Sequence, residues 1–182
     1  MKKLIFGFLF CFSGIILYSH PHIYIKPTID LRVVGNRVTG IVVTWEWDRW
    51  WSDEVIVNCD ANRNGRFETV EAEKVYSGYF IGVQDFNFFT EIKANNRRLN
   101  FSGVTDFVPT MSNRIVTYRF VIPVEIPLNT AQNIRIVFND ETIFVAFEQI
   151  AIAGNARVLY SNKSVETVGY YGTALNTGVS LR

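Results

Sequence analysis

Apolar and polar residues alternate along much of the chain after residue 28, as they do in half-buried β-strands. Residues 29–34 and 37–47 alternate on either side of Gly35-Asn36, which predicts a β-hairpin with Trp45 and Trp47 on one face. Runs of β-branched and aromatic residues predict further strands, at residues 86–93, 99–101, 115–122, 134–138 and 143–147. Seven or more short strands at this spacing indicate a mainly β protein, an antiparallel β-sandwich of the Ig-like type.

Turn residues refine this prediction in two places. The segment 94–97, Ala-Asn-Asn-Arg, separates two predicted strands and suits a second hairpin turn. Pro123 and Pro127 cannot donate to a sheet ladder, so the segment between them is expected to bend or to lie on a sheet edge.

Helical patterns are confined to one stretch. Residues 52–54, Ser-Asp-Glu, suit the N-cap and acidic first turn of a short helix that runs to about Val57. From Thr69 to Phe80 apolar side chains recur at helical spacing. We therefore expect a helix–loop–helix insertion over about residues 48–80, within a single domain that covers residues 20–182.

The loop between these helices, residues 60–71, has the spacing of an EF-hand calcium loop. Asp60 opens it, Gly65 lies where the backbone must turn sharply, and Glu71 closes it at position 12. The backbone carbonyl of position 7 is also a ligand in such loops. The candidate calcium ligands are therefore Asp60, Asn62, Asn64, Arg66, Glu68 and Glu71.

An ion-free Asx-turn between two helices is the alternative interpretation of this loop. Arg63 and Arg66 lower the local negative potential. If calcium binds, we expect a modest affinity, with a dissociation constant of roughly 10⁻⁴ to 10⁻³ M, as in extracellular modules.

The first nineteen residues are typical of a secretory signal peptide. Met1-Lys2-Lys3 is a charged start, residues 4–18 are largely apolar, and Ser19 is a small residue at the expected cut. The apolar stretch is shorter than the roughly 20 residues that cross a bilayer. We expect residues 1–19 to be removed during export, which leaves no membrane span.

The two histidines of the chain, His20 and His22, would then stand at the new N-terminus. Pro21 favours an extended backbone, in which residues two apart point to the same side. With the free α-amine they offer nitrogen ligands suited to Ni²⁺, Zn²⁺ or Cu²⁺, and a copper site is a further possibility. The alternative is an exposed terminus that binds nothing.

Charge and the remaining reactive residues exclude several functions. The net charge of +1 offers no basic patch for nucleic acid. Cys59 would be the only cysteine after cleavage, so we expect a buried thiol and no internal disulfide. No histidine remains as the base of a Ser or Cys triad, so the sequence does not predict an enzyme.

Two further groups of residues have a structural and a functional interpretation. Aromatic residues in alternating strands are more often core than ligand platform, and this applies to Trp45, Trp47, Trp50 and Trp51. Asp140-Glu141 follows a predicted strand and is expected to form a turn. Otherwise this pair would approach the metal sites.

Several of these segments together resemble a family of bacterial periplasmic proteins of unknown function. Members are often described as the periplasmic component of an uncharacterised ABC-type transport system. The resemblance rests on His20–Ile25, Val43–Asp48, Asp60–Glu71, Tyr79-Phe80 and Phe138–Asp140. It implies export to the periplasm and an association with an inner-membrane permease for transition metals, nickel or cobalt in particular.

The sequence thus supports two functional hypotheses. In the first, His20 and His22 capture or relay a transition metal for such a permease, while the 60–71 loop binds calcium structurally. In the second, a non-catalytic, calcium-stabilised β-sandwich binds an envelope or protein partner.

Overall fold

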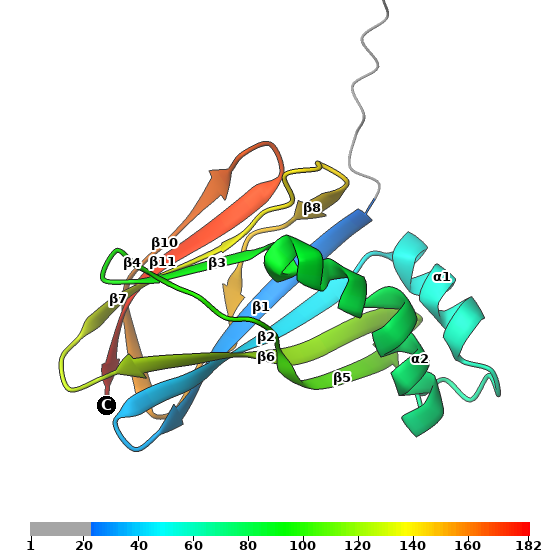
Figure 1. The fold of residues 1–182 in the computed structure, drawn as a ribbon, viewed down its shortest axis with the longest axis horizontal. Coiled ribbons are helices and arrows are strands. Elements are labelled where there is room, and N and C mark those ends of the chain that lie inside the picture. Colours follow the sequence, from blue (N-terminus) through cyan, green and yellow to red (C-terminus); the bar gives the residue numbers. More distant parts are fainter. Residues whose placement is uncertain (1–22) are drawn as a thin grey trace, which may run out of the picture.

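The computed structural model describes residues 23–182, which form eleven strands in two sheets together with three helices (Figure 1). The predicted mainly β sandwich with a helical insertion is confirmed. The predicted signal peptide, residues 1–19, and the predicted metal ligands His20 and His22 lie outside the described residues.

The larger sheet is built around the first hairpin. Its strands run in the order β5-β6-β2-β1-β8, and β9 pairs with β1 further along. Antiparallel pairing joins β1 to β2 and β2 to β6, whereas β8 and β9 lie parallel to β1. The strands are β1 (Ile23–Val34), β2 (Arg37–Trp47), β5 (Thr105–Ser112), β6 (Ile115–Pro127), β8 (Val145–Phe147) and β9 (Ala151–Ile152).

The smaller sheet is antiparallel throughout and runs in the order β10-β11-β7-β3-β4. Its strands are β3 (Thr90–Ala94), β4 (Arg97–Leu99), β7 (Gln132–Phe138), β10 (Val158–Val168) and β11 (Gly172–Leu181). Asn95 and Asn96 form the β3–β4 turn with φ of 47° and 64°, as the predicted second hairpin turn requires.

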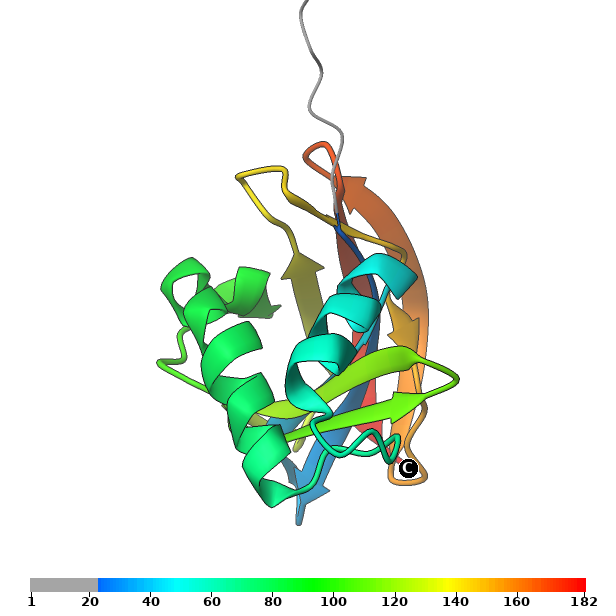
Figure 2. The same ribbon diagram turned by 90° about the vertical axis from the view of Figure 1, so that its right-hand side faces the viewer.

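Three helices, α1 (Arg49–Cys59), α2 (Thr69–Tyr79) and the 3₁₀ helix η1 (Ile81–Phe89), connect β2 to β3. Figures 1 and 2 show α1 and α2 side by side at the β5–β6 end of the larger sheet, away from the smaller sheet. Val55 and Cys59 of α1 and Val75 of α2 are fully buried and belong to the core. The helices thus cover part of the core that the smaller sheet leaves open.

Trp45 lies at the centre of this core and touches both sheets and the helices. Its ring centroid lies 4.8 Å from that of Phe120, and 6.2 Å from those of Phe80 and Phe138. The core interpretation is confirmed for Trp45 and Trp47, which are 0% and 4% exposed, but it is wrong for Trp50, which is 62% exposed.

The first helix begins earlier than predicted, because Asp48 rather than Ser52 is its N-cap. The Asp48 carboxylate accepts hydrogen bonds from the amides of Trp51 (2.8 Å) and Tyr24 (2.6 Å). The buried Ser52 hydroxyl instead accepts from the amide of Val116, at 2.9 Å. A tertiary contact therefore uses the side chain that the sequence pattern assigned to a cap.

Several strand predictions also need correction at their ends. The strand predicted at residues 99–101 is β4, which runs from Arg97 to Leu99. Residues 86–89 belong to η1, so the strand begins at Thr90, and the strand predicted from residue 143 begins at Val145. The segment Pro123–Pro127 does not leave the sheet. It continues β6 where β5 no longer pairs, so the prediction of an edge position is confirmed.

Candidate functional site: the Asp60–Glu71 loop

The loop joins the end of α1 to the start of α2, and both of its terminal carboxylates are almost buried. Asp60 is 7% and Glu71 9% exposed. Phe67, within the loop, is partly buried against the core. Two acids at this depth need hydrogen bonds or an opposite charge to offset their desolvation.

Asp60 obtains hydrogen bonds from the middle of the loop. One carboxylate oxygen accepts from the amide of Asn64 and the other from the amide of Gly65, each at 3.1 Å. Gly65 takes a φ of +77°, which an L-residue adopts only at a cost. The turn at Gly65 therefore brings two backbone donors onto Asp60.

Asn62 and Asn64 act as a pair in the same turn. The Asn62 side-chain oxygen accepts from the Asn64 amide at 3.0 Å, and the Asn64 oxygen accepts from the Arg66 amide at 2.9 Å. Their Nδ2 groups donate to the two carboxylate oxygens of Glu68, at 3.2 Å and 2.9 Å. These contacts fix which way each amide faces, with its oxygen directed to the loop backbone.

Glu71 closes the loop from the opposite end. Its Oε1 accepts from the Ala61 amide at 2.9 Å and more weakly from the Asn62 amide at 3.4 Å, while Oε2 accepts from the Glu68 amide at 3.1 Å. The Glu68 side chain in turn accepts from the Glu71 amide, which completes a capping box. These backbone donors, the Glu68 amide first, hold the pKa of the Glu71 carboxyl below its ordinary value.

The donor set of this loop fits a hard cation. It offers carboxylate oxygens from Asp60 and Glu71 and amide oxygens from Asn62 and Asn64, with no sulfur or nitrogen ligand. Each of these four side chains accepts fewer hydrogen bonds than its oxygens have lone pairs, so acceptor capacity remains for an ion. In residues 23–182 no group of three or more His, Cys, Asp and Glu side chains could hold a metal ion, so any site here depends on its amides.

The remaining predicted ligands have distinct positions. Glu68 caps α2, and its carboxylate accepts hydrogen bonds from the side chains of Asn62 and Asn64. It therefore orients the two asparagines. Arg66 is expected to contribute only its carbonyl, and its amide is already bonded to Asn64.

Cys59, directly before Asp60, is fully buried as predicted, and this burial raises the pKa of its thiol. A protonated, buried thiol is a poor ligand and a poor nucleophile.

A second buried aspartate, Asp140, forms the turn that the sequence predicts. Its Oδ1 accepts from the amide and the hydroxyl of Thr142, at 2.9 Å and 2.7 Å. Its Oδ2 accepts from the amides of Phe144 (3.2 Å) and Val145 (2.9 Å). The turn therefore uses all the acceptor capacity of this carboxylate.

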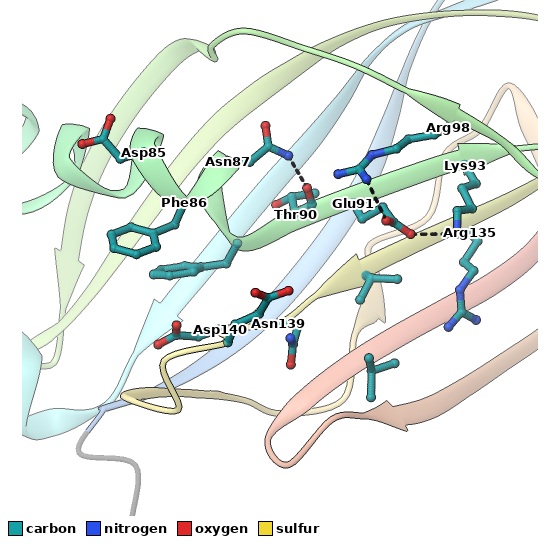
Figure 3. A pocket seen from close by; sticks show the side chains of 14 residues that line it. Asp85, Phe86, Asn87, Thr90, Glu91, Lys93, Arg98, Arg135, Asn139 and Asp140 are labelled. Atoms are coloured by element: carbon teal, nitrogen blue, oxygen red, sulfur yellow. Dashed lines mark hydrogen bonds and ion pairs between the residues drawn. The ribbon is translucent and has the colours of Figure 1, made fainter.

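A pocket of about 550 Å³ lies on the outer face of the smaller sheet, between η1 and the Asp140 turn (Figure 3). Its cations are already paired: Glu91 lies 2.9 Å from Lys93 and 3.5 Å from Arg98, and Arg135 pairs with Glu166. This pattern is that of a solvated, charged sheet face, and we assign it no ligand. Glu91, Lys93 and Arg135 alternate with buried residues along β3 and β7. This alternation is visible in the sequence and indicates a charged, solvent-facing side of the sheet.

The wall of this pocket contains an unusual backbone segment. Asn87, Phe88 and Phe89 have φ of 51°, 50° and 50°, three successive non-glycine residues in the left-handed region. Phe88 is 1% exposed, and its carbonyl accepts from the Thr90 hydroxyl at 2.6 Å. Burial and hydrogen bonding thus hold a conformation that the local sequence disfavours, and no sequence pattern pointed to it.

Comparison with known proteins identifies the family. Residues 5–164 match the family described as "Protein of unknown function (DUF1007)", and the chain belongs to it. An "Uncharacterized 15.5 kDa protein in trpE 3'region" from Spirochaeta aurantia is 28% identical over 90 residues, which cover 50% of this chain and 64% of that protein. No solved structure matches the chain. In the described part of the chain, none of the helices has the length and apolar character needed to cross a membrane.

Proposed function

We propose that this protein is an exported, non-catalytic β-sandwich that is stabilised by calcium and handles transition metal ions for an inner-membrane transport system. The observation that supports the calcium part is the geometry of the Asp60–Glu71 loop. Its carboxylates and amide oxygens are oriented by hydrogen bonds from the loop backbone itself. A site that is preorganised in this way pays little ordering cost on binding.

Calcium in this loop would act on stability rather than on chemistry. Asp60 follows α1 directly, and Glu71 lies in the first turn of α2, so one ion would tie together the two helices that contribute Val55, Cys59 and Val75 to the core. At a dissociation constant of about 0.3 mM and about 2 mM free calcium, mass action supplies about 1 kcal/mol. This corresponds to a rise in Tm of about 3 °C for a domain of this size.

The calcium test is a thermal melt of the protein with EGTA and then with about 2 mM calcium or magnesium. We expect calcium to raise Tm and magnesium to have less effect, and Glu71→Gln to abolish the calcium shift. Glu73→Gln removes the same charge two residues further along α2 and is the matched control. A calcium shift that survives in Glu71→Gln, or is absent from the unmodified protein, would contradict the proposal.

The transition-metal part of the proposal rests on His20-Pro21-His22 and on the resemblance to periplasmic transport components, not on the described residues. Two imidazoles and the α-amine of His20 are borderline donors that favour Ni²⁺, Zn²⁺ or Cu²⁺ over Ca²⁺. We expect export to the periplasm, cleavage after Ser19 and binding of one such ion. A metal permease is then the partner that receives it.

Calorimetric titration of the exported protein with Ni²⁺, Zn²⁺ and Cu²⁺ tests this part, with mass spectrometry to fix the N-terminal residue. We expect His22→Ala to weaken binding by roughly tenfold or more, since it removes one of few ligands. Asp60→Asn should leave this binding unchanged, which separates the two sites. If no transition metal binds while the calcium shift persists, the protein is instead the calcium-stabilised, partner-binding sandwich of the second hypothesis.

A further inference from the structure

Five large aromatic side chains are exposed on the described part of the chain, and we call them the aromatic rim. Their exposed fractions range from 46% to 82%. Phe144 is one of them, although it also has an interaction of its own. The rim consists of Tyr24, Trp50, Phe86, Phe144 and Tyr170.

Sheet register places the whole rim at one end of the sandwich. Ile23 is opposite Val145, and the amide of Asp48, which caps the helix that carries Trp50, donates to the Tyr24 carbonyl. In the smaller sheet Phe138 pairs with both Thr90 and Thr173. These residues lie next to the segments that carry Phe86, Phe144 and Tyr170.

Two further contacts lie at this end, of which the first joins the two sheets and the second joins the end of β7 to η1. The Phe147 amide donates to the Tyr171 carbonyl at 2.8 Å, and the Asn139 amide to the Phe89 carbonyl at 2.9 Å. Tyr24 and Tyr170 line one groove of about 240 Å³. Figures 1 and 2 both show the start of β1, the loop before β8 and the β10–β11 turn at the upper end of the molecule.

The exposed aliphatic residues have a different distribution. Val34 and Leu159 lie on β1 and β10 at the end of the sandwich that is remote from the rim. The other exposed aliphatic residues are Val57 on α1, Val70 on α2 and Val108 on β5. Isolated exposed aliphatic side chains are ordinary, whereas a group confined to aromatic residues at one end needs an explanation. Tyrosine and tryptophan prefer the boundary between water and the acyl chains, because each has an apolar ring and a polar group.

The order of the sequence places this end next to the predicted signal peptide. Ile23 begins β1 at the rim, and only residues 19–22 separate it from the apolar stretch of residues 4–18. Four residues span at most roughly 14 Å, even when fully extended. While the apolar stretch is in the export machinery or the bilayer, the rim is therefore held close to the membrane surface.

We propose that the aromatic rim rests on the surface of a lipid bilayer and inserts its rings at the level of the headgroups. Asp85, Glu141 and Glu148 lie beside the rim, are exposed and form no ion pair with any other residue of 23–182. These acids disfavour an anionic surface, so the partner is a bilayer of zwitterionic lipid. The surface role is independent of the proposed metal function.

The first test uses Trp50 as a reporter. Trp45 and Trp47 are 0% and 4% exposed and Trp51 is partly buried against the core, whereas Trp50 is 62% exposed, so a quencher in the lipid reaches Trp50 most readily. The exported protein is mixed with phosphatidylcholine vesicles that contain brominated acyl chains. We expect partial quenching of the tryptophan fluorescence, and Trp50→Phe should remove most of the quenchable part.

The second test is flotation with the same lipid, in which a double variant of the rim is compared with a matched control. Trp50→Ser with Tyr170→Ser should lower the floated fraction roughly tenfold, since two buried rings are lost. Val34→Ser with Leu159→Ser removes exposed apolar residues elsewhere and should leave flotation unchanged. Thermal melts confirm that both variants are folded, and mass spectrometry confirms that both start at the same residue.

Four outcomes would overturn the proposal or its assignment to zwitterionic lipid. The unmodified protein fails to float with phosphatidylcholine, or the control variant loses as much binding as the rim variant. Another such outcome is that the unmodified protein binds no vesicle but associates with itself or with another protein, and that the rim variant abolishes this association. In that case the rim is a protein contact surface. Stronger flotation with added phosphatidylglycerol would contradict the assignment to zwitterionic lipid.

Discussion

Two buried aspartates in this protein open loops in a similar way, yet they leave different amounts of acceptor capacity unused. Asp140 accepts four hydrogen bonds within the next five residues. Asp60 accepts two, from the amides of Asn64 and Gly65. A carboxylate has about four lone-pair sites, so the first is saturated and the second is half used.

The surroundings of the two carboxylates increase this difference. Asp60 shares its loop with Asn62, Asn64 and Glu71, whose side chains also accept from the loop backbone, whereas the Asp140 turn is bonded through Asp140 and Thr142. Burial alone therefore does not distinguish the candidate ion site from the Asp140 turn, since the exposed fractions of Asp60 and Asp140 are 7% and 5%. The distinguishing property is the surplus of oxygen lone pairs over the hydrogen bonds that these oxygens accept.

The largest effect we predict is for Asp140→Ala. It leaves the amides of Thr142, Phe144 and Val145 without their acceptor beside buried strand β8, so the free energy of unfolding should fall by about 3 kcal/mol. Urea denaturation with and without calcium measures it, and the loss should be the same in both. Glu141→Ala, at the exposed neighbouring position, should change stability by less than about 0.5 kcal/mol. A calcium-dependent loss in Asp140→Ala would show that this turn also binds an ion.

A smaller effect of a different kind is predicted for Asp60→Asn. The amide keeps one acceptor oxygen for the Asn64 amide but removes a charge, so stability without calcium should fall by about 1 kcal/mol. The rise in Tm with calcium should disappear. Asp140→Asn is the opposite case, because it should lower stability and keep the calcium response. If both variants keep it, the loop does not bind calcium through Asp60.

Backbone conformation provides a third comparison, inside the Asp60 loop. Gly65 has φ of +77°, and a methyl group added to its Cα would meet no atom within 4 Å, so Gly65→Ala should cost only the backbone strain, about 1 kcal/mol. Arg63 already adopts a φ of +57° without being glycine. Arg63→Gly should relieve a similar strain, offset by greater freedom in the unfolded chain, and change stability by less than about 0.5 kcal/mol. Urea denaturation of both variants in EGTA measures these effects, and an equal loss in both would exclude local strain as the cause.

The sequence predicted those parts of the fold that depend on local patterns. The first hairpin has its expected turn at Gly35, and the Thr69–Phe80 helix ends within one residue of the prediction. The predicted loop between the two helices is present, and its hydrogen bonds join residues at most ten apart in the chain, whereas calcium binding in it stays a prediction.

Long-range contacts explain what could not be predicted. Ser52 was assigned to a helix cap, but Val116, 64 residues away, uses its hydroxyl. Phe88 has a strong strand propensity, yet its burial and the bond from Thr90 hold it in the left-handed region. The aromatic rim is also a tertiary property, since its members come from separate segments that only the sheet register brings to one end.

The smallest effect is predicted for a carboxylate that belongs to neither loop. Glu91, with 32% of its side chain exposed, lies 2.9 Å from Lys93, and the hydrogen bond from this lysine is the main cause that lowers the pKa of the Glu91 carboxyl. A folded-state pKa below the unfolded one stabilises the protein above the unfolded value, and this contribution is lost as the pH falls through the folded value. Glu91→Gln should therefore cost about 0.5 kcal/mol at neutral pH and almost nothing near pH 3. Urea denaturation at the two pH values measures this, with Glu73→Gln as the control. An equal loss of stability at both pH values would mean that Glu91 acts through packing and not through its charge.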